Sequence, residues 1–247
     1  MSSLPYDRSV QLWKMTRRQF REGINDGSLK VAIIPTGSTE QHNEHLEMSH
    51  DTASAVHVSS LAAQKLYPNV VVTTPIAIGI SEHWMDHKGT LTTRPEIFTE
   101  LLYDVADSMK RGGIQHVMAI NGHAGNAGPV NNVLDDLKSR LGIDFRFHSY
   151  WESFDENLVK KQMESGNCPG HASEFETSFA YAAFPRQIHW EGVDYDNADL
   201  TIGEVDRATQ DRDFHHEAKL ANAVKGQAMI DVAVDWVASK VQEMIGS

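Results

Sequence analysis

Side chains able to bind metal ions follow a short apolar segment near the start of the chain. Glu40 and His42 are two residues apart, and Asp51 follows shortly after them. In an extended backbone, side chains two residues apart point to the same side. Carboxylate oxygens and imidazole nitrogens are ligands that zinc, manganese and iron accept. These residues therefore predict a metal site directly after the apolar segment 31–34.

The elements that must position these residues are alternating strands and helices. Apolar, β-branched or alternating runs predict strands over residues 31–34, 70–74, 116–120 and 144–151. Helical spacing predicts helices over residues 17–25, 51–65, 95–111, 129–141, 171–184 and 214–241. Alternating strands and helices favour a mainly parallel sheet. We find no repeat or linker, so we expect a single domain over residues 1–247.

Further donor groups follow the other predicted strands. His83 comes after the second strand, His123 after the third, and the start of the helix at residue 171 adds an imidazole and two carboxylates: His171, Glu174 and Glu176. The carboxyl ends of parallel strands lie at one edge of a sheet, which is where such folds bind ligands. We therefore expect these side chains, distant in sequence, to converge on one site.

Composition narrows the classes of partner. The 247 residues include 34 acidic and 22 basic residues, which give a formal charge of −12. This balance excludes a nucleic-acid or anionic-membrane surface, because both require positive charge. The predicted partner is therefore a small molecule. No apolar run is long enough to span a membrane and the amino terminus lacks a signal pattern, so a cytoplasmic location is expected.

Cysteine usage limits the kind of metal site. Cys168 is the only cysteine, which excludes an intrachain disulfide and a thiolate zinc cluster.

Three of the candidate acids could also have purely structural roles. Asp51 alone could cap a helix, and Glu174 and Glu176 could complement the amino terminus of one.

Four blocks of motifs, in order and at their spacing, resemble the creatininase (creatinine amidohydrolase) family from about Leu12 to Pro185. They are Gly-Ser-Thr-Glu-Gln-His followed by His-Leu and Asp-Thr; Glu-His-Trp before Lys-Gly-Thr-Leu-Thr; Asn-Gly-His-Ala-Gly-Asn; and His-Ala-Ser-Glu-Phe-Glu-Thr-Ser. The resemblance implies a three-layer αβα sandwich and two divalent metal ions, which could be zinc, manganese or iron.

The resemblance also implies a ligand arrangement and a mechanism. Glu40 corresponds to a ligand of one metal, His42 and His123 to ligands of the other, and Asp51 to the bridging carboxylate. Two such metals can share a hydroxide that attacks a carbonyl carbon. Creatininase has a glutamate at the position of Gly125, so another donor is expected here.

Roles for the remaining candidates follow from the same resemblance. The missing donor is assigned to Glu176, with Glu174 as the alternative. His171 matches a histidine assigned to proton transfer, and Glu174 is grouped with it as a catalytic candidate. His83 and Trp84 are expected to line the mouth of the site. Asn126 is expected to hold polar atoms of the substrate.

The predicted function is hydrolysis of an amide-like carbon–nitrogen bond, with ring opening of a small polar cyclic substrate. Polar residues stand where the family usually has Gly-Pro and Phe-Pro, namely Asn43-Glu44 and His87-Lys88, and predict a polar pocket. Alternatives are carbon–carbon cleavage of a cyclic diketone such as 3-dehydro-scyllo-inosose, trimming of a precursor peptide, metal-dependent isomerisation, and a non-catalytic sensor. Relatives form hexamers, so the resemblance implies a homo-oligomer.

Overall fold

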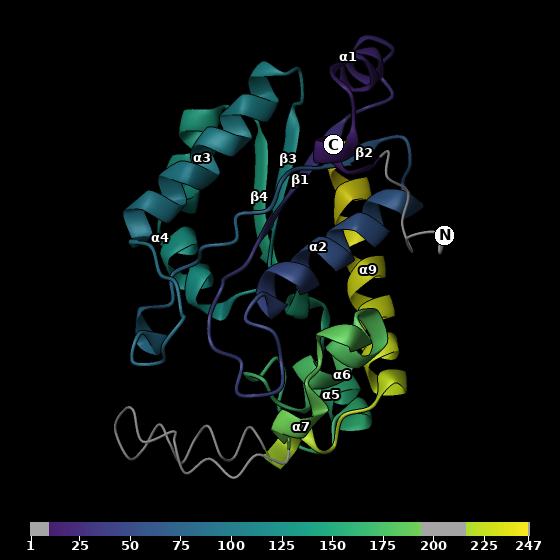
Figure 1. Cartoon of the computed structure of the whole chain (residues 1–247). Helices are drawn as coiled ribbons and strands as arrows, with labels where there is room; N and C mark the ends of the chain where they lie inside the picture. The colour runs from purple at the N-terminus through teal and green to yellow at the C-terminus, as the bar shows by residue number, and fades with distance from the viewer. Residues whose placement is uncertain (1–9, 194–215, 247) are drawn as a thin grey trace.

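The computed structural model describes residues 10–193 and 216–246, and it centres on a four-stranded sheet (Figure 1). The strand order is β2-β1-β3-β4, and the pairings of β1 with β2, of β1 with β3 and of β3 with β4 are all parallel. The strands are β1 (Val31–Thr36), β2 (Val70–Val72), β3 (His116–Asn121) and β4 (Asp144–Ser149). All four carboxyl ends therefore face one edge.

Helices cover both faces of this sheet and bury its side chains in alternation. Val31, Ile33 and Met118 pack in one apolar cluster with α2 (His50–Lys65), α6 (Glu174–Ala183) and α9 (Ala223–Ile245). Ala32 and Val117 belong to the opposite cluster, with α3 (Pro95–Arg111) and α4 (Ala124–Leu141). Figure 1 shows α2 and α9 on one side of the strands and α3 and α4 on the other. This arrangement is the predicted three-layer αβα sandwich.

Shorter elements connect these layers. They are η2 (Leu12–Lys14), α1 (Arg17–Asn25), η3 (Glu82–Trp84), η4 (Tyr150–Ser153), α5 (Glu156–Gln162), η5 (Pro185–Gln187) and α7 (Trp190–Val193), where η denotes a 3-10 helix. The capping box expected at α1 is present, with the Thr16 side chain accepting from the backbone N–H of Gln19. None of the helices in the described part of the chain combines the length and apolarity needed to cross a membrane.

Most predicted elements are present, but three helix starts differ. The helix expected from residue 129 begins at Ala124, and Pro129 lies inside it. The prediction was wrong because the amino-terminal turn of a helix needs no hydrogen-bond partners within the helix, so the glycine-containing segment can join it. The helix expected from residue 171 begins at Glu174, and the last long helix begins at Ala223. Its expected first residue, Phe214, lies outside the described residues.

Candidate metal centre

Five predicted ligands lie together at the carboxyl edge of the sheet. Glu40 and His42 are in the loop after β1, Asp51 is in the first turn of α2, His123 precedes α4, and Glu176 is in the first turn of α6. All five side chains are buried. The topology therefore brings the sequence-distant donors together, as the strand-end argument predicts.

Each of the two histidines is held by a backbone carbonyl on one ring nitrogen. Nδ1 of His42 lies 3.1 Å from the carbonyl oxygen of Glu40, and Nε2 of His123 lies 3.0 Å from that of Ile80. A carbonyl can only accept, so these nitrogens donate. The opposite nitrogens, Nε2 of His42 and Nδ1 of His123, then face the carboxylates. Metal-binding histidines are typically oriented by such a bond on the far nitrogen.

Asp51 lies between the two imidazoles with one oxygen toward each. Its Oδ1 is 3.0 Å from Nε2 of His42, and its Oδ2 is 3.0 Å from Nδ1 of His123. Glu40 Oε1 lies 3.4 Å from the same His123 nitrogen, while Glu176 Oε2 lies 3.7 Å from Nε2 of His42. The donors thus form two groups that share Asp51.

This grouping differs from the one that the family resemblance implied. There, His42 and His123 were ligands of the same metal, and Glu40 belonged to the other. In the structure, the shortest contacts place His123 with Glu40 and His42 with Glu176, although Glu40 also falls in a candidate group with His42 and His171. The reason is that the two rings are anchored on carbonyls of different loops, so their outward nitrogens reach different carboxylates.

The donor set fits divalent cations. Within residues 10–193 and 216–246, Oε2 of Glu40 and Oδ2 of Asp51 have no hydrogen-bond partner although both are buried. The Asp51 oxygen is close to His123 but lacks hydrogen-bond geometry. Buried polar atoms without a partner are costly. A cation coordinated by these oxygens and the neighbouring imidazole nitrogens would remove that cost, and this mixture of ligands suits zinc, manganese or iron.

Without a cation, protons compensate for the buried negative charge. Burial alone would lower the pKa of His42, but the charge of Asp51 outweighs it and raises that pKa to about 10. The pKa of His123 is also raised, because its close contacts with the carboxylates of Asp51 and Glu40 outweigh burial. Burial and the neighbouring carboxylates raise the pKa of Glu176 to about 8. The cluster therefore attracts cations, and protons occupy it in their absence.

A glycine after β3 allows this close approach. A Cβ atom at Gly122 would lie 2.2 Å from the backbone oxygen of Asp51. Only glycine permits this contact between the end of β3 and the first turn of α2. The contact brings Asp51 beside His123, so the glycine in the Asn-Gly-His motif has a packing role.

His171 lies beside the donor cluster with a defined tautomer. The Gln41 side-chain amide donates to Nε2 of His171 at 2.8 Å, so the ring proton is on Nδ1, which lies 3.7 Å from Glu40 Oε1. Burial, together with the charge of His42, lowers the pKa of His171 well below its usual value. The ring also stacks on Trp84, with centroids 4.4 Å apart. His171 is therefore a neutral imidazole held next to the carboxylates.

A cavity of about 110 Å³ opens onto the cluster. Its walls include the predicted mouth residues His83 and Trp84, and also Trp151, which sequence reasoning missed. Trp151 follows β4 directly, so the strand-end rule could have found it. Gln41 was also missed, although it lies inside the Glu-Gln-His motif. The four residues expected to make the pocket polar do not contribute to the described lining: Asn43, Glu44, His87 and Lys88.

Asn126, the predicted substrate contact, is fully buried and does not line the described cavity. Its side-chain nitrogen donates to the Gly37 carbonyl and to Asn121 Oδ1, and its side-chain oxygen accepts from the Ile80 N–H. These bonds tie together the segments after β1, β2 and β3. The structure therefore gives Asn126 a positioning role, and its contact with substrate remains a prediction.

Glu174 is also fully buried, and its carboxylate is already occupied. Lys225 Nζ lies 2.6 Å from Oε1, and the backbone N–H groups of Glu164 and Ser165 donate to the two oxygens at 3.1 and 2.8 Å. These partners hold the segment that leads to His171. Glu176, rather than Glu174, is the acid that faces the cluster.

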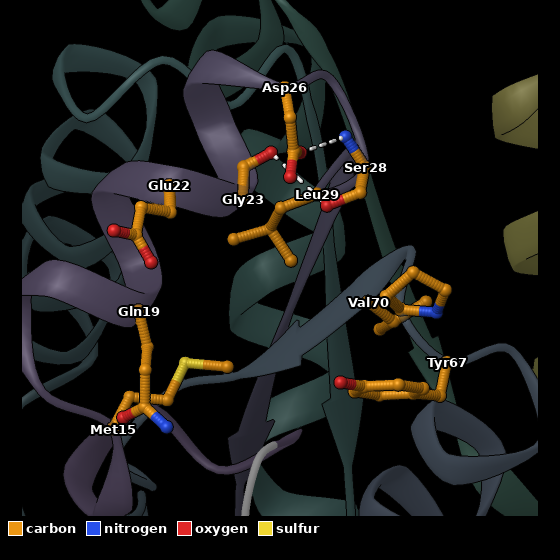
Figure 2. A pocket seen from close by; sticks show the side chains of 10 residues that line it. Met15, Gln19, Glu22, Gly23, Asp26, Ser28, Leu29, Tyr67 and Val70 are labelled. Carbon is orange, nitrogen blue, oxygen red and sulfur yellow. Dashed lines mark hydrogen bonds between the residues drawn. The ribbon is translucent and has the colours of Figure 1, made fainter.

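Another cavity, of about 220 Å³, lies beside the amino ends of β1 and β2 (Figure 2). It is lined by α1, Leu29 and the segment from Tyr67 to Val70. The Asp26 carboxylate there accepts the N–H of Ser28 at 2.8 Å. Among the described residues, none of the candidate metal-binding groups includes a residue of this cavity. The predicted chemistry is thus confined to the opposite end of the strands.

Known proteins resemble this chain over 43% to 96% of its length. Creatinine amidohydrolase from Pseudomonas putida is 24% identical over 256 residues, covering 96% of this chain and 97% of its own. The 3-dehydro-scyllo-inosose hydrolase of Thermotoga maritima is 27% identical over 206 residues, covering 81% of this chain and 65% of its own. A mycofactocin precursor peptide peptidase from Mycobacterium ulcerans is 29% identical over 114 residues, covering 43% and 45%.

Solved structures show the same fold. A crystal structure of creatinine amidohydrolase superposes with a TM-score of 0.81 at 21% identity, covering 96% of this chain and 99% of that one. A manganese form of creatininase gives 0.79 at 20% identity, covering 95% and 98%. The creatininase family profile, described as creatinine amidohydrolase, matches residues 13–241. The chain therefore belongs to the creatininase family and is a metal-dependent hydrolase of that family.

Proposed function

We propose that the chain hydrolyses a small polar cyclic substrate at a carbonyl carbon, using two divalent cations held by the clustered donors. Glu40 and His123 would hold one cation, His42 and Glu176 the other, and Asp51 would contribute to both. The observation that carries the proposal is the placement of the two Asp51 oxygens, each 3.0 Å from a different imidazole nitrogen.

The chain's own residues supply orientation and proton transfer. Paired divalent cations lower the pKa of water and polarise a carbonyl group. His171 is the proton-transfer residue in this proposal, since it is a neutral imidazole at the wall of the cavity. The Gln41 amide fixes its tautomer, and Trp84 fixes the plane of its ring. As a neutral imidazole, His171 can take a proton from the attacking water and then pass it to the leaving nitrogen as the carbon–nitrogen bond breaks.

The cavity supports a small ring as the substrate. Its volume of about 110 Å³ suits a compact molecule, and the indole rings of Trp84 and Trp151 are among its walls. Carboxylates and imidazoles supply its polar surface. A Cβ atom at Gly125 would lie 2.2 Å from the Ile80 carbonyl oxygen, so this backbone has no room for the glutamate that creatininase has there. This difference at position 125 favours a small ring other than creatinine as the substrate.

A second candidate is hydrolysis of a carbon–carbon bond in a cyclic diketone. The similarity to the Thermotoga inosose hydrolase favours it, since that relative acts on a hydroxylated ring. Peptide trimming has weaker support, because the peptidase similarity covers 43% of the chain and the cavity is small.

The test is turnover by metal-stripped and reconstituted protein. We expect activity on cyclic amides or cyclic diketones to disappear with chelator and to return with zinc or manganese. Mass spectrometry of products formed in ¹⁸O-labelled water separates the two bond types, because one yields a carboxylate and an amine and the other an open-chain keto acid. Activity that persists without bound metal would contradict the proposal.

We also infer that the chain self-associates. On α3, Ile97 and Leu101 lie one turn apart and are 47% and 45% exposed. Ile78 and Leu91, on the segments that precede this helix, are each 46% exposed. Apolar side chains at this exposure support burial against another copy. Light scattering on the purified protein tests this, and a monomer at micromolar concentration would contradict it.

A further inference from the structure

His83 lies close enough to Glu40 and His123 to share a cation with them. One donor atom of each residue lies within 4.8 Å of the others. The His83 ring is parallel to that of His123, with an interplanar angle of 6° and centroids 5.8 Å apart. Unlike the buried donors, His83 is exposed at the mouth of the cavity.

Gly125 leaves the space that this ring occupies. A Cβ atom there would lie 3.1 Å from Cε1 of His83 and 2.4 Å from Nε2 of His123. A side chain at position 125 would therefore displace the His83 ring or the carbonyl of Ile80. Glycine at this position therefore leaves room for the His83 ring beside that of His123.

The loop that carries His83 is held in place on both sides. Before it, the Ile80 carbonyl accepts from His123, and the Ile80 N–H is bound by Asn126. After it, Trp84 is buried and stacks on His171. The backbone is therefore fixed near the cluster, with a ring nitrogen of His83 within 4.8 Å of donor atoms of Glu40 and His123.

We propose that His83 is a ligand of the cation held by Glu40, His123 and Asp51. This inference rests on the proposed two-cation function. It makes the two positions unequal, since one then has four protein donors and the other has three: His42, Asp51 and Glu176. Zinc sites with four protein ligands are closed, whereas catalytic sites keep a position open. By this count, the position with three protein donors, of which Glu176 lines the cavity, has room for a further ligand.

Metal binding by the stripped full-length protein tests this without a substrate. Zinc titration against a chromophoric chelator compares the wild type with His83→Ala, His83→Asp and His87→Ala. His87 belongs to the same loop and stays outside the cluster, which makes it the matched control. We expect His83→Ala to weaken one of the two bound equivalents by about tenfold or more, His83→Asp to recover part of the loss, and His87→Ala to bind as the wild type does.

The cobalt-substituted proteins give an independent readout. Loss of a nitrogen ligand should change the visible absorption of one Co²⁺ equivalent in His83→Ala and not in His87→Ala. Unchanged zinc affinity and an unchanged cobalt spectrum in His83→Ala would overturn the inference, as would equal losses in both variants. Fewer than two equivalents in the wild type would instead contradict the two-cation function itself.

Discussion

Two buried acidic regions at the same edge of the sheet differ in how their charge is satisfied. Glu174 is fully buried, and its carboxylate receives Lys225 and two backbone N–H groups. Glu40 and Asp51 are as deeply buried, but each has one oxygen without a hydrogen-bond partner among the described residues. The acids of both regions are therefore equally buried, and the regions differ in the number of hydrogen bonds that their carboxylate oxygens receive.

This difference separates a structural acid from a candidate ligand. A buried carboxylate with donors on both oxygens is stable as it stands, whereas one that lacks them needs a proton or a cation. The pKa values agree with this distinction. Lys225 helps to lower the pKa of Glu174 despite its burial, while protons are retained around Asp51, on His42 and on Glu176.

The largest expected effect comes from Asp51, which both cation positions share. Asp51→Asn should abolish binding of both equivalents and reduce turnover by roughly 10³-fold or more, about 4 kcal/mol of transition-state stabilisation. Zinc titration and initial rates measure these effects. Asp231→Asn, an acid hydrogen-bonded to Gln227 on the exposed face of α9, is the control and should change neither. Retention of both equivalents by Asp51→Asn would remove the basis for a shared ligand.

Lys225→Met should affect stability rather than metal binding. The substitution leaves the buried Glu174 carboxylate without its countercharge, which costs about 3–5 kcal/mol of unfolding free energy. Lys240→Met, which breaks the pair with Glu243 on the same helix, should cost no more than about 1 kcal/mol. Urea unfolding of the two variants measures the difference.

Glu174→Gln distinguishes the structural role from the catalytic one. It should lower stability and leave both metal equivalents bound, because its partners lie outside the donor cluster. Unchanged stability together with a large loss of turnover would restore Glu174 as a catalytic residue and would break the distinction between the two acidic regions.

Sequence reasoning located the cluster because the topology alone determines where strand ends meet. Glu40 and His123 follow β1 and β3, which are neighbours in the sheet, so their convergence needs only the strand order. The direction of each imidazole was not predictable in this way. It depends on the carbonyl that each ring binds, and for His123 that carbonyl belongs to Ile80, on a distant loop.

The roles of two further residues were unpredictable for the same reason, because they depend on contacts between segments that are distant in sequence. Asn126 lies within a recognisable motif, but its partners, Gly37 and Ile80, come from two other loops. Glu174 is bonded to Lys225, which no motif includes. The motifs identified the candidate site residues, and only the packing showed which of them face the cavity.

The pH dependence of stability should sharpen the comparison. Unfolded, Glu176 loses its proton near pH 4.5, but the folded protein keeps it to about pH 8. The pKa of His42 is shifted in the same direction, from 6.5 in the unfolded chain to about 10 in the folded protein. The metal-free protein should therefore lose stability as the pH rises from 6.5 to 8, by up to about 1.4 kcal/mol per pH unit for each group.

Two further histidines of α2, the buried His50 and the half-buried His57, affect stability in the opposite pH range. Burial lowers the pKa of His50 to about 3 and that of His57 to about 4, so their contribution is complete above pH 6.5 and is lost as the pH falls. Urea unfolding at pH 6.5 and 8 thus isolates the metal cluster. Saturating zinc should flatten the dependence, because the cation replaces the protons. A metal-free protein that gains stability over this interval would contradict the assignment.

The smallest effect is expected at Gln41, which acts through His171. Gln41→Ala removes the donor to Nε2 of His171 and frees the tautomer, so we expect turnover to fall about tenfold, the scale of one neutral hydrogen bond at about 1.4 kcal/mol. Zinc affinity should not change, because the Gln41 side chain is bonded to His171 and to the backbone N–H of Asn43 rather than to one of the five proposed cation ligands. Gln41→Glu places a carboxylate at the same position and should raise the pKa of His171, since a negative charge favours the imidazolium. Histidine ring NMR measures that pKa directly. If Gln41→Ala weakened metal binding as strongly as turnover, His171 would have to be counted among the ligands, and the boundary between the cation cluster and the residues that support it would move.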